Sequence, residues 1–214
     1  MKKQILLFDL DGTLIDSQAG IVQSVLYTLK QYGIDEKPEN LNCYIGPPVG
    51  EALSRYHGFA EEDIPEAVRT YRAHYRAHSM TGNDLFPGVL EMLDTFIARG
   101  KTVAIATSKP IEVALPILND LGVTDRFAFI SGSTLAGERP HKIDVIRYAL
   151  EQLSVSDLSQ VVMIGDRHYD IDGAKIAGID SIGVLYGYAS ENELSNAGAD
   201  TLALTAADLL DIIQ

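Results

Sequence analysis

Short apolar segments without polar–apolar alternation are the feature that most limits how this chain can fold. Such segments have the length and composition of strands buried on both faces. Four are clear, at residues 5–10, 102–106, 127–130 and 161–164, a fifth is expected at 181–185 and a weaker sixth near 201–204. Amphipathic helical patterns separate them from about residue 84 onward. We therefore predict right-handed β–α–β units and a doubly wound α/β fold, with helices on both faces of a parallel sheet.

The stretch from residue 16 to residue 82 interrupts this alternation. Apolar residues between positions 21 and 29 fall on one helix face, and another helical pattern runs from about 61 to 79. No strand pattern lies between them. The sequence therefore predicts a helical domain of residues 16–82, inserted into an α/β core domain of residues 1–15 and 83–214.

Composition limits the class of partner. The formal net charge is −13, which disfavours nucleic acid polymers and anionic membranes because both attract clustered cations. No apolar run approaches the roughly 20 residues needed to cross a bilayer. Cys43 is the single cysteine, so no internal disulfide is possible. We expect a cytoplasmic protein, a monomer or weak homodimer, that acts on a small molecule.

Polar side chains gather where the predicted strands end. In open parallel sheets, ligands bind beyond the carboxyl ends of the strands. The first, second and fourth predicted strands each run into acids, hydroxyls or a lysine, and another lysine follows the third. These residues are Asp9, Asp11, Thr107, Ser108, Lys109, Lys142, Asp166 and Asp170. We therefore expect them to meet at one edge of the sheet.

This set of side chains suits phosphoryl transfer. Carboxylates are the hard oxygen ligands that Mg²⁺ prefers, and a carboxylate can also attack phosphorus. Lysine and hydroxyl groups stabilise the charge on the transferring phosphoryl group. A second carboxylate two residues after the first can protonate the leaving alcohol and then activate water. The sequence thus predicts a magnesium-dependent enzyme that acts on a phosphate ester.

The motifs also resemble those of a known family. Residues 9–13, Asp-Leu-Asp-Gly-Thr, resemble the first motif of the haloacid dehalogenase-like hydrolase superfamily. Residues 106–108 resemble its second motif, residues 165–170 its acidic fourth motif, and the helical insertion its C1 cap domain. Within the superfamily, the chain looks most similar to phosphoglycolate phosphatases and to relatives described as 5′-nucleotidases.

The resemblance assigns roles to the acids. It implies that Asp9 is the nucleophile and a metal ligand. Asp11 would be the acid and base, and would offer its backbone carbonyl to the metal. Asp166 would ligate Mg²⁺ directly, and Asp170 would ligate it through water or orient the motif-three lysine.

The resemblance also assigns residues that bind the phosphoryl group. Thr107, Ser108, Gly12 and Lys142 are the candidates. Many relatives place the motif-three lysine directly before a proline, whereas here Arg139 precedes Pro140 and the lysine follows at position 142. We prefer Lys142 because it opens the next predicted helix, and Arg139 remains the alternative.

Residues of the insertion are harder to interpret. Three arginines share a helix face and are expected to form a solvated stripe, and two tyrosines on another face are expected to belong to the core of the insertion. Arg55 and the Gly46-Pro47-Pro48 turn are better candidates for specificity, since cap loops in this family face the active site. The arginines are Arg69, Arg72 and Arg76, and the tyrosines are Tyr71 and Tyr75.

The favoured function is hydrolysis of a small phosphate monoester, phosphoglycolate-like or a nucleoside 5′-monophosphate, through an aspartyl-phosphate on Asp9. A cap over the site favours a small phosphorylated metabolite over a phosphoprotein. A phosphomutase of the β-phosphoglucomutase type would share every core residue and remains an alternative. A dehalogenase is disfavoured by the extra acids, and a non-enzymatic module that binds a phosphorylated ligand is disfavoured by the cap.

Overall fold

A six-stranded, fully parallel sheet forms the centre of the molecule in the computed structural model, which describes residues 1–80 and 83–214. The order of the strands is β5-β4-β1-β6-β7-β8. All six apolar segments that the sequence singled out become strands of this sheet. Their bounds are β1 Ile5–Phe8, β4 Thr102–Pro110, β5 Phe129–Ser133, β6 Val161–Gly165, β7 Asp180–Val184 and β8 Thr201–Ala203.

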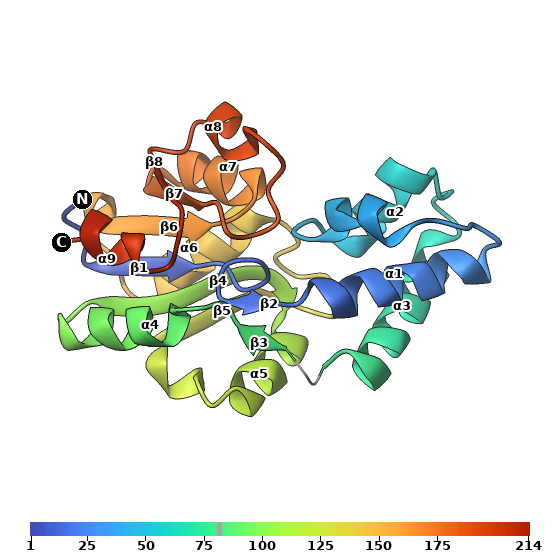
Figure 1. Cartoon of the computed structure of the whole chain (residues 1–214), viewed down its shortest axis with the longest axis horizontal. Coiled ribbons are helices and arrows are strands. Elements are labelled where there is room, and N and C mark those ends of the chain that lie inside the picture. The colour runs from blue at the N-terminus through green and yellow to red at the C-terminus, as the bar shows by residue number, and fades with distance from the viewer. Residues whose placement is uncertain (81–82) are drawn as a thin grey trace.

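Helices cover both faces of the sheet, which confirms the doubly wound α/β fold (Figure 1). Successive residues of β1 alternate between the two faces. Leu6 and Phe8 contribute to a core shared with α4, α5 and α9, whereas Leu7 packs with α6 and α7. The helices of this domain are α4 Val89–Ala98, α5 Ile111–Asp120, α6 Lys142–Gln152, α7 His168–Ala177, α8 Glu193–Ala197 and α9 Asp208–Ile212.

A group of helices lies beyond the carboxyl ends of the strands, at the right of Figure 1. We call it the cap. It consists of α1 Gln18–Gln31, α2 Val49–His57 and α3 Ile64–His78, with two 3₁₀ turns, η1 Pro38–Asn40 and η2 Asn42–Tyr44. Buried residues of α1 and α2, among them Val25, Leu29 and Leu53, join the larger core cluster. The cap is therefore packed against the α/β domain through continuous apolar contact.

A short antiparallel ribbon marks the place where the chain enters and leaves the cap. It pairs β2, Ile15–Asp16, with β3, Asp84–Leu85. The sequence did not predict these strands, which are too short to show a periodic pattern. The predicted boundary after residue 82 lies outside the described residues, so the division into residues 16–82 and the remainder stays a prediction.

None of the helices in residues 1–80 and 83–214 combines the length and the apolar character that crossing a membrane requires.

Candidate active site

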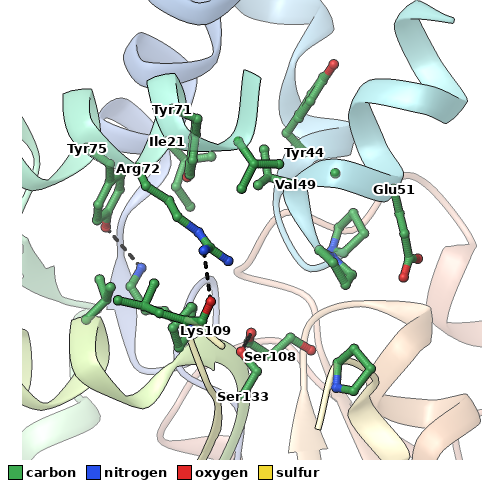
Figure 2. Close-up of a pocket in the computed structure, with 18 of the residues that line it drawn as sticks. Ile21, Tyr44, Val49, Glu51, Tyr71, Arg72, Tyr75, Ser108, Lys109 and Ser133 are labelled. Atoms are coloured by element: carbon green, nitrogen blue, oxygen red, sulfur yellow. Dashed lines mark hydrogen bonds between the residues drawn. The ribbon is translucent and has the colours of Figure 1, made fainter. Parts of the chain in front are cut away.

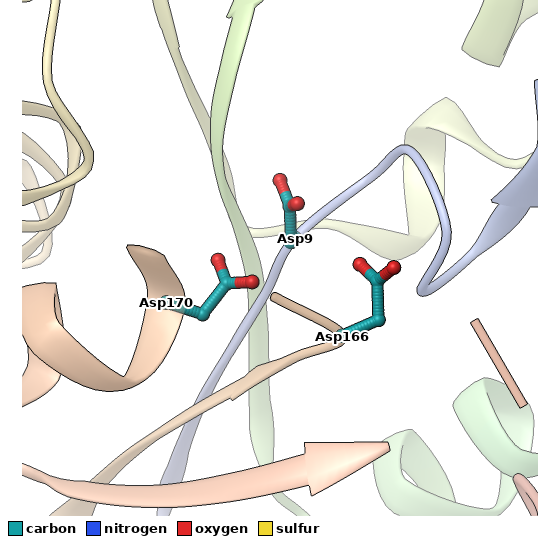
Figure 3. A group of neighbouring side chains, drawn as sticks. All are labelled: Asp9, Asp166 and Asp170. Carbon is teal, nitrogen blue, oxygen red and sulfur yellow. The ribbon is translucent and has the colours of Figure 1, made fainter. Parts of the chain in front are cut away.

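Three aspartates meet at the carboxyl edge of the sheet (Figure 3). Asp9 follows β1 directly, Asp166 follows β6, and Asp170 lies in the first turn of α7. Each offers an oxygen within 4.8 Å of those of the other two, and exposed fractions are 4%, 0% and 0%. Parallel pairing of β1 with β6 brings Asp9 and Asp166 together although they are far apart in the sequence. The expectation that the strand ends converge is thus met for these acids.

Two glycines make room for the acids. A Cβ atom on Gly12 would lie 2.2 Å from Asp166 Oδ2, and the φ angle of +85° at Gly12 is one that other residues rarely adopt. A Cβ atom on Gly165 would lie 2.1 Å from Asp170 Cγ. The glycines in the two acidic motifs therefore allow the backbone to pass close to these carboxylates. A contact of Gly12 with a phosphoryl group remains a prediction.

Asp166 is held by donors from two other segments. Thr13 Oγ1 donates to its Oδ1 at 3.2 Å, and the backbone N–H of Tyr188 donates to its Oδ2 at 2.8 Å. Burial raises the pKa of Asp166 well above its usual range, and the charges of Asp170 and Asp9 raise it further. A carboxylate in this position is destabilised unless a cation lies nearby.

Lys142 is the cation nearest to Asp9. Its Nζ lies 2.7 Å from Asp9 Oδ1 and 2.8 Å from Asp170 Oδ1, and it donates to the Ala106 carbonyl at 3.1 Å. Both carboxylate oxygens are therefore close enough to form ion pairs with the Lys142 ammonium group. Burial raises the pKa of Asp9 to about 6, with Lys142 opposing and Asp170 and Asp11 adding to the rise. Lys142 itself is buried, which lowers its pKa, but the two aspartates raise it more.

The side chain of Arg139, the alternative to Lys142, contacts residues other than the acidic cluster. Its Nε donates to the Gly132 carbonyl at 3.0 Å, and its guanidinium lies 4.3 Å from the ring centroid of Tyr148. Its backbone φ angle of 52° belongs to the left-handed region. Only Lys142 of these two cations therefore lies beside the acidic cluster.

Asp11 points away from the three-carboxylate cluster and pairs with Lys109. The Lys109 Nζ lies 2.7 and 3.0 Å from the two Asp11 oxygens and 2.9 Å from the Tyr75 hydroxyl on α3. Lys109 is buried, which lowers its pKa, and Asp11 and Tyr75 raise it more. Sequence reasoning assigned no role to Lys109, although its place at the end of a strand beside Thr107 and Ser108 was a signal.

Thr107 and Ser108 lie at the same edge. The Thr107 hydroxyl accepts a hydrogen bond from the Lys109 backbone N–H at 3.2 Å, and the Ser108 carbonyl accepts one from Ser133 Oγ at 2.7 Å. Both residues line a cavity that also reaches Asp9 and Asp11. Their position is compatible with the predicted contacts to a phosphoryl group, which remain a prediction.

The cavity lies between the cap and the core and has a volume of about 730 Å³ (Figure 2). Arg55 and the Gly46-Pro47-Pro48 turn line it, and their role in specificity remains a prediction. Tyr71 and Tyr75 pack in the apolar core as expected, and they also line the cavity. Arg69 and Arg76 are exposed, as expected of a solvated stripe, although Arg76 also borders the cavity. The expectation was wrong for Arg72, which is half-buried and lines the cavity.

Comparison with known proteins identifies the family. Residues 6–184 match the family model described as haloacid dehalogenase-like hydrolase. The chain therefore belongs to the haloacid dehalogenase-like hydrolase family. A 5′-nucleotidase of Pseudomonas aeruginosa is 40% identical over 190 residues, which cover 88% of this chain and 86% of that protein. A phosphoglycolate phosphatase of Colwellia psychrerythraea is 34% identical, with 92% and 91% covered.

Another relative carries a different name, and a solved structure has a very similar fold. A protein of Mycobacterium tuberculosis named tyrosine-protein kinase PtkA is 38% identical over 212 residues, with 99% of this chain and 71% of that protein covered. The crystal structure of a predicted phosphatase from Clostridium acetobutylicum has a TM-score of 0.95 at 38% identity, covering 99% of this chain and 98% of that one. The predicted resemblance to this family of phosphatases is confirmed.

Proposed function

We propose that the chain hydrolyses a small phosphate monoester in two steps, through an aspartyl-phosphate on Asp9, with Mg²⁺ as its cofactor. The observation that carries the proposal is the position of the Asp9 carboxylate. It lines the cavity, 2.7 Å from Lys142 and within reach of two further buried carboxylates. A nucleophile, a cation for the phosphoryl oxygens and a metal-binding group are thus adjacent.

The acidic cluster fits a hard divalent cation. Asp9, Asp166 and Asp170 would hold Mg²⁺, and the Asp11 backbone carbonyl is a further candidate ligand. Three buried carboxylates face one lysine, so the group carries excess negative charge. Bound Mg²⁺ would offset this charge and that of the phosphoryl oxygens.

In the first step, an oxygen of Asp9 attacks phosphorus and the bond from phosphorus to the alcohol oxygen breaks. Asp11, which pairs with Lys109 in this structure, has to be protonated in the substrate complex, and it then gives that proton to the leaving alcohol. Thr107, Ser108 and Lys142 bind the phosphoryl oxygens. In the second step, Asp11 takes a proton from a water molecule that attacks phosphorus, the bond to Asp9 breaks, and inorganic phosphate leaves.

The cavity bears on the choice of substrate. Its volume of about 730 Å³ lies within the range typical of sites for drug-sized ligands and far exceeds what phosphoglycolate needs. Apolar and aromatic side chains of the cap contribute to its wall, as Figure 2 shows for Ile21, Val49 and Tyr71. Both features favour an alcohol of nucleoside size over glycolate.

The test is a panel of phosphate monoesters assayed for phosphate release with Mg²⁺ and with EDTA. We expect turnover that requires the metal, and a phosphoryl-enzyme after acid quenching of the wild type that is absent from Asp9→Asn. The matched control is Asp172→Asn, an exposed aspartate on α7. Phosphatase activity retained by folded Asp9→Asn contradicts the nucleophile, and a rate unaffected by EDTA contradicts the cofactor. Transfer of phosphate to a sugar without release would favour the phosphomutase.

A further inference from the structure

Arg72 has unused hydrogen-bond donors inside the cavity. It is half-buried on α3, and its Nη1 donates to the Leu135 carbonyl at 3.0 Å. Within residues 1–80 and 83–214, this is its one side-chain hydrogen bond, and no carboxylate pairs with it. A guanidinium group has five N–H donors in a planar fork. Figure 2 shows the group extending from α3 into the space between the cap and the core.

A neighbouring arginine on the same helix behaves differently. Arg69 lies one turn earlier on α3, is exposed, and forms an ion pair with Glu66. Its charge is therefore balanced at the surface. Arg72 lines the cavity, and no acid of the described chain forms an ion pair with it, so its free donors are available to a ligand bound there.

The surroundings of Arg72 would strengthen such a contact. Tyr71 and Tyr75 flank it in the sequence and stack with their ring centroids 5.9 Å apart, and Val68 also lines the cavity. Apolar walls exclude water and reduce screening, so a charge-assisted hydrogen bond made there is stronger than one at the surface. They also favour an alcohol whose surface is mostly apolar or aromatic.

We propose that Arg72 is a specificity-determining residue that binds a hydrogen-bond acceptor on the leaving alcohol of the substrate. The substrate class is a phosphate monoester whose alcohol is largely apolar or aromatic and carries an acceptor beyond the ester, such as a carboxylate, a second phosphate, a carbonyl or a ring nitrogen. The inference rests on the proposed phosphatase function, because it concerns the group that leaves when Asp9 attacks.

A purely structural role for Arg72 makes a different prediction. Its bond to Leu135 crosses from α3 to the loop after β5, so Arg72 also joins the cap to the core. If joining is its whole role, replacing it should affect every ester equally. If it binds an acceptor, the loss should depend on whether the ester carries one.

Matched esters separate these two roles. Phenyl phosphate and 4-carboxyphenyl phosphate share a ring and differ by one acceptor, and AMP and phosphoglycolate place acceptors at other distances from phosphorus. For Arg72→Met, we expect kcat/KM to fall about 10- to 100-fold on at least one acceptor-bearing ester, mainly through KM. Phenyl phosphate should change less than about 3-fold. Arg69→Met is the matched control and should leave all four esters unchanged.

Two results would overturn the inference. One is an equal loss on all four esters, and the other is no loss on any of them. Thermal unfolding of each variant checks the fold. If Arg72→Met does not fold, Arg72→Lys decides, since it keeps the charge but loses the fork, and a selective though smaller loss is then expected. Failure of the wild type to hydrolyse any ester would instead refute the proposed phosphatase function.

Discussion

Replacing Asp9 by asparagine should abolish turnover and, at the same time, stabilise the metal-free protein at neutral pH. Asn has nearly the shape of Asp but no charge. In the folded chain, the Asp9 carboxylate is buried and repelled by Asp170 and Asp11, and Lys142 offsets only part of this. Lys142 keeps Asp170 as a partner at 2.8 Å after the substitution, so no cation is left unpaired.

The size of the effect follows from the pKa of Asp9, which rises from 3.8 in the unfolded chain to about 6 in the folded protein. Between these values the folded state binds more protons than the unfolded state, so the free energy of unfolding falls as pH rises. Above pH 6, the buried Asp9 carboxylate destabilises the folded protein to the full extent. A difference of roughly 2 pKa units corresponds to about 3 kcal/mol. Asparagine removes this penalty, which should raise Tm by roughly 6–12 °C for a chain of this length.

The assay is thermal and urea unfolding of the wild type and Asp9→Asn in EDTA, from pH 4 to pH 7.5. The free energy of unfolding of Asp9→Asn should equal that of the wild type at the acidic end. Its excess over the wild type should grow as pH rises towards 6 and then remain constant. Added Mg²⁺ should reduce it, because the cation stabilises the wild-type carboxylate. Asp172→Asn should show no such trend. If Asp9→Asn is no more stable than the wild type at pH 7.5 in EDTA, the reasoning from burial and repulsion is wrong.

Three more predictions concern the same cluster. Lys142→Met leaves Asp9 and Asp170 without their cation, so urea unfolding in EDTA should show a loss of about 3–5 kcal/mol, together with loss of turnover. Gly12→Ala would place its Cβ 2.2 Å from Asp166 Oδ2, so calorimetry should show Mg²⁺ affinity reduced by roughly 10-fold or more. Because the pKa of Asp9 is about 6, the apparent Kd for Mg²⁺ should increase by roughly tenfold or more per pH unit below that value, which calorimetry over a pH series measures.

Much of the fold and the acidic cluster could be predicted from local patterns. A buried parallel strand is a short apolar run whatever it pairs with, so six runs sufficed to predict six strands. The convergence of Asp9 and Asp166 then follows from topology, since the carboxyl ends of parallel strands share one edge. Sequence left Arg139 and Lys142 as alternatives because the loop between them has no periodicity to fix which side chain turns inward.

The residues that sequence reasoning missed all depend on how the cap packs on the core. Helical periodicity shows that Tyr71 and Tyr75 lie near one another on α3, but it does not show what that face meets. Tyr75 is buried in the larger core cluster, and its hydroxyl accepts a hydrogen bond from Lys109 of the core. Arg72 shares a helix face with Arg69 and Arg76, which predicted that it is solvated, yet it lines the cavity. Contacts between segments distant in sequence have no local signature.

Several polar contacts between cap and core end next to the candidate catalytic residues. Lys109 joins Tyr75 to Asp11, and Arg167, adjacent to Asp166, donates to the carbonyls of Asn42 and Ile45 in the cap. The position of the cap and the order of the acids therefore depend on shared interactions. A variant of a cap residue can lower activity by displacing an acid without touching substrate. Loss of rate alone consequently does not identify a substrate contact, and only a loss that depends on the leaving alcohol does so.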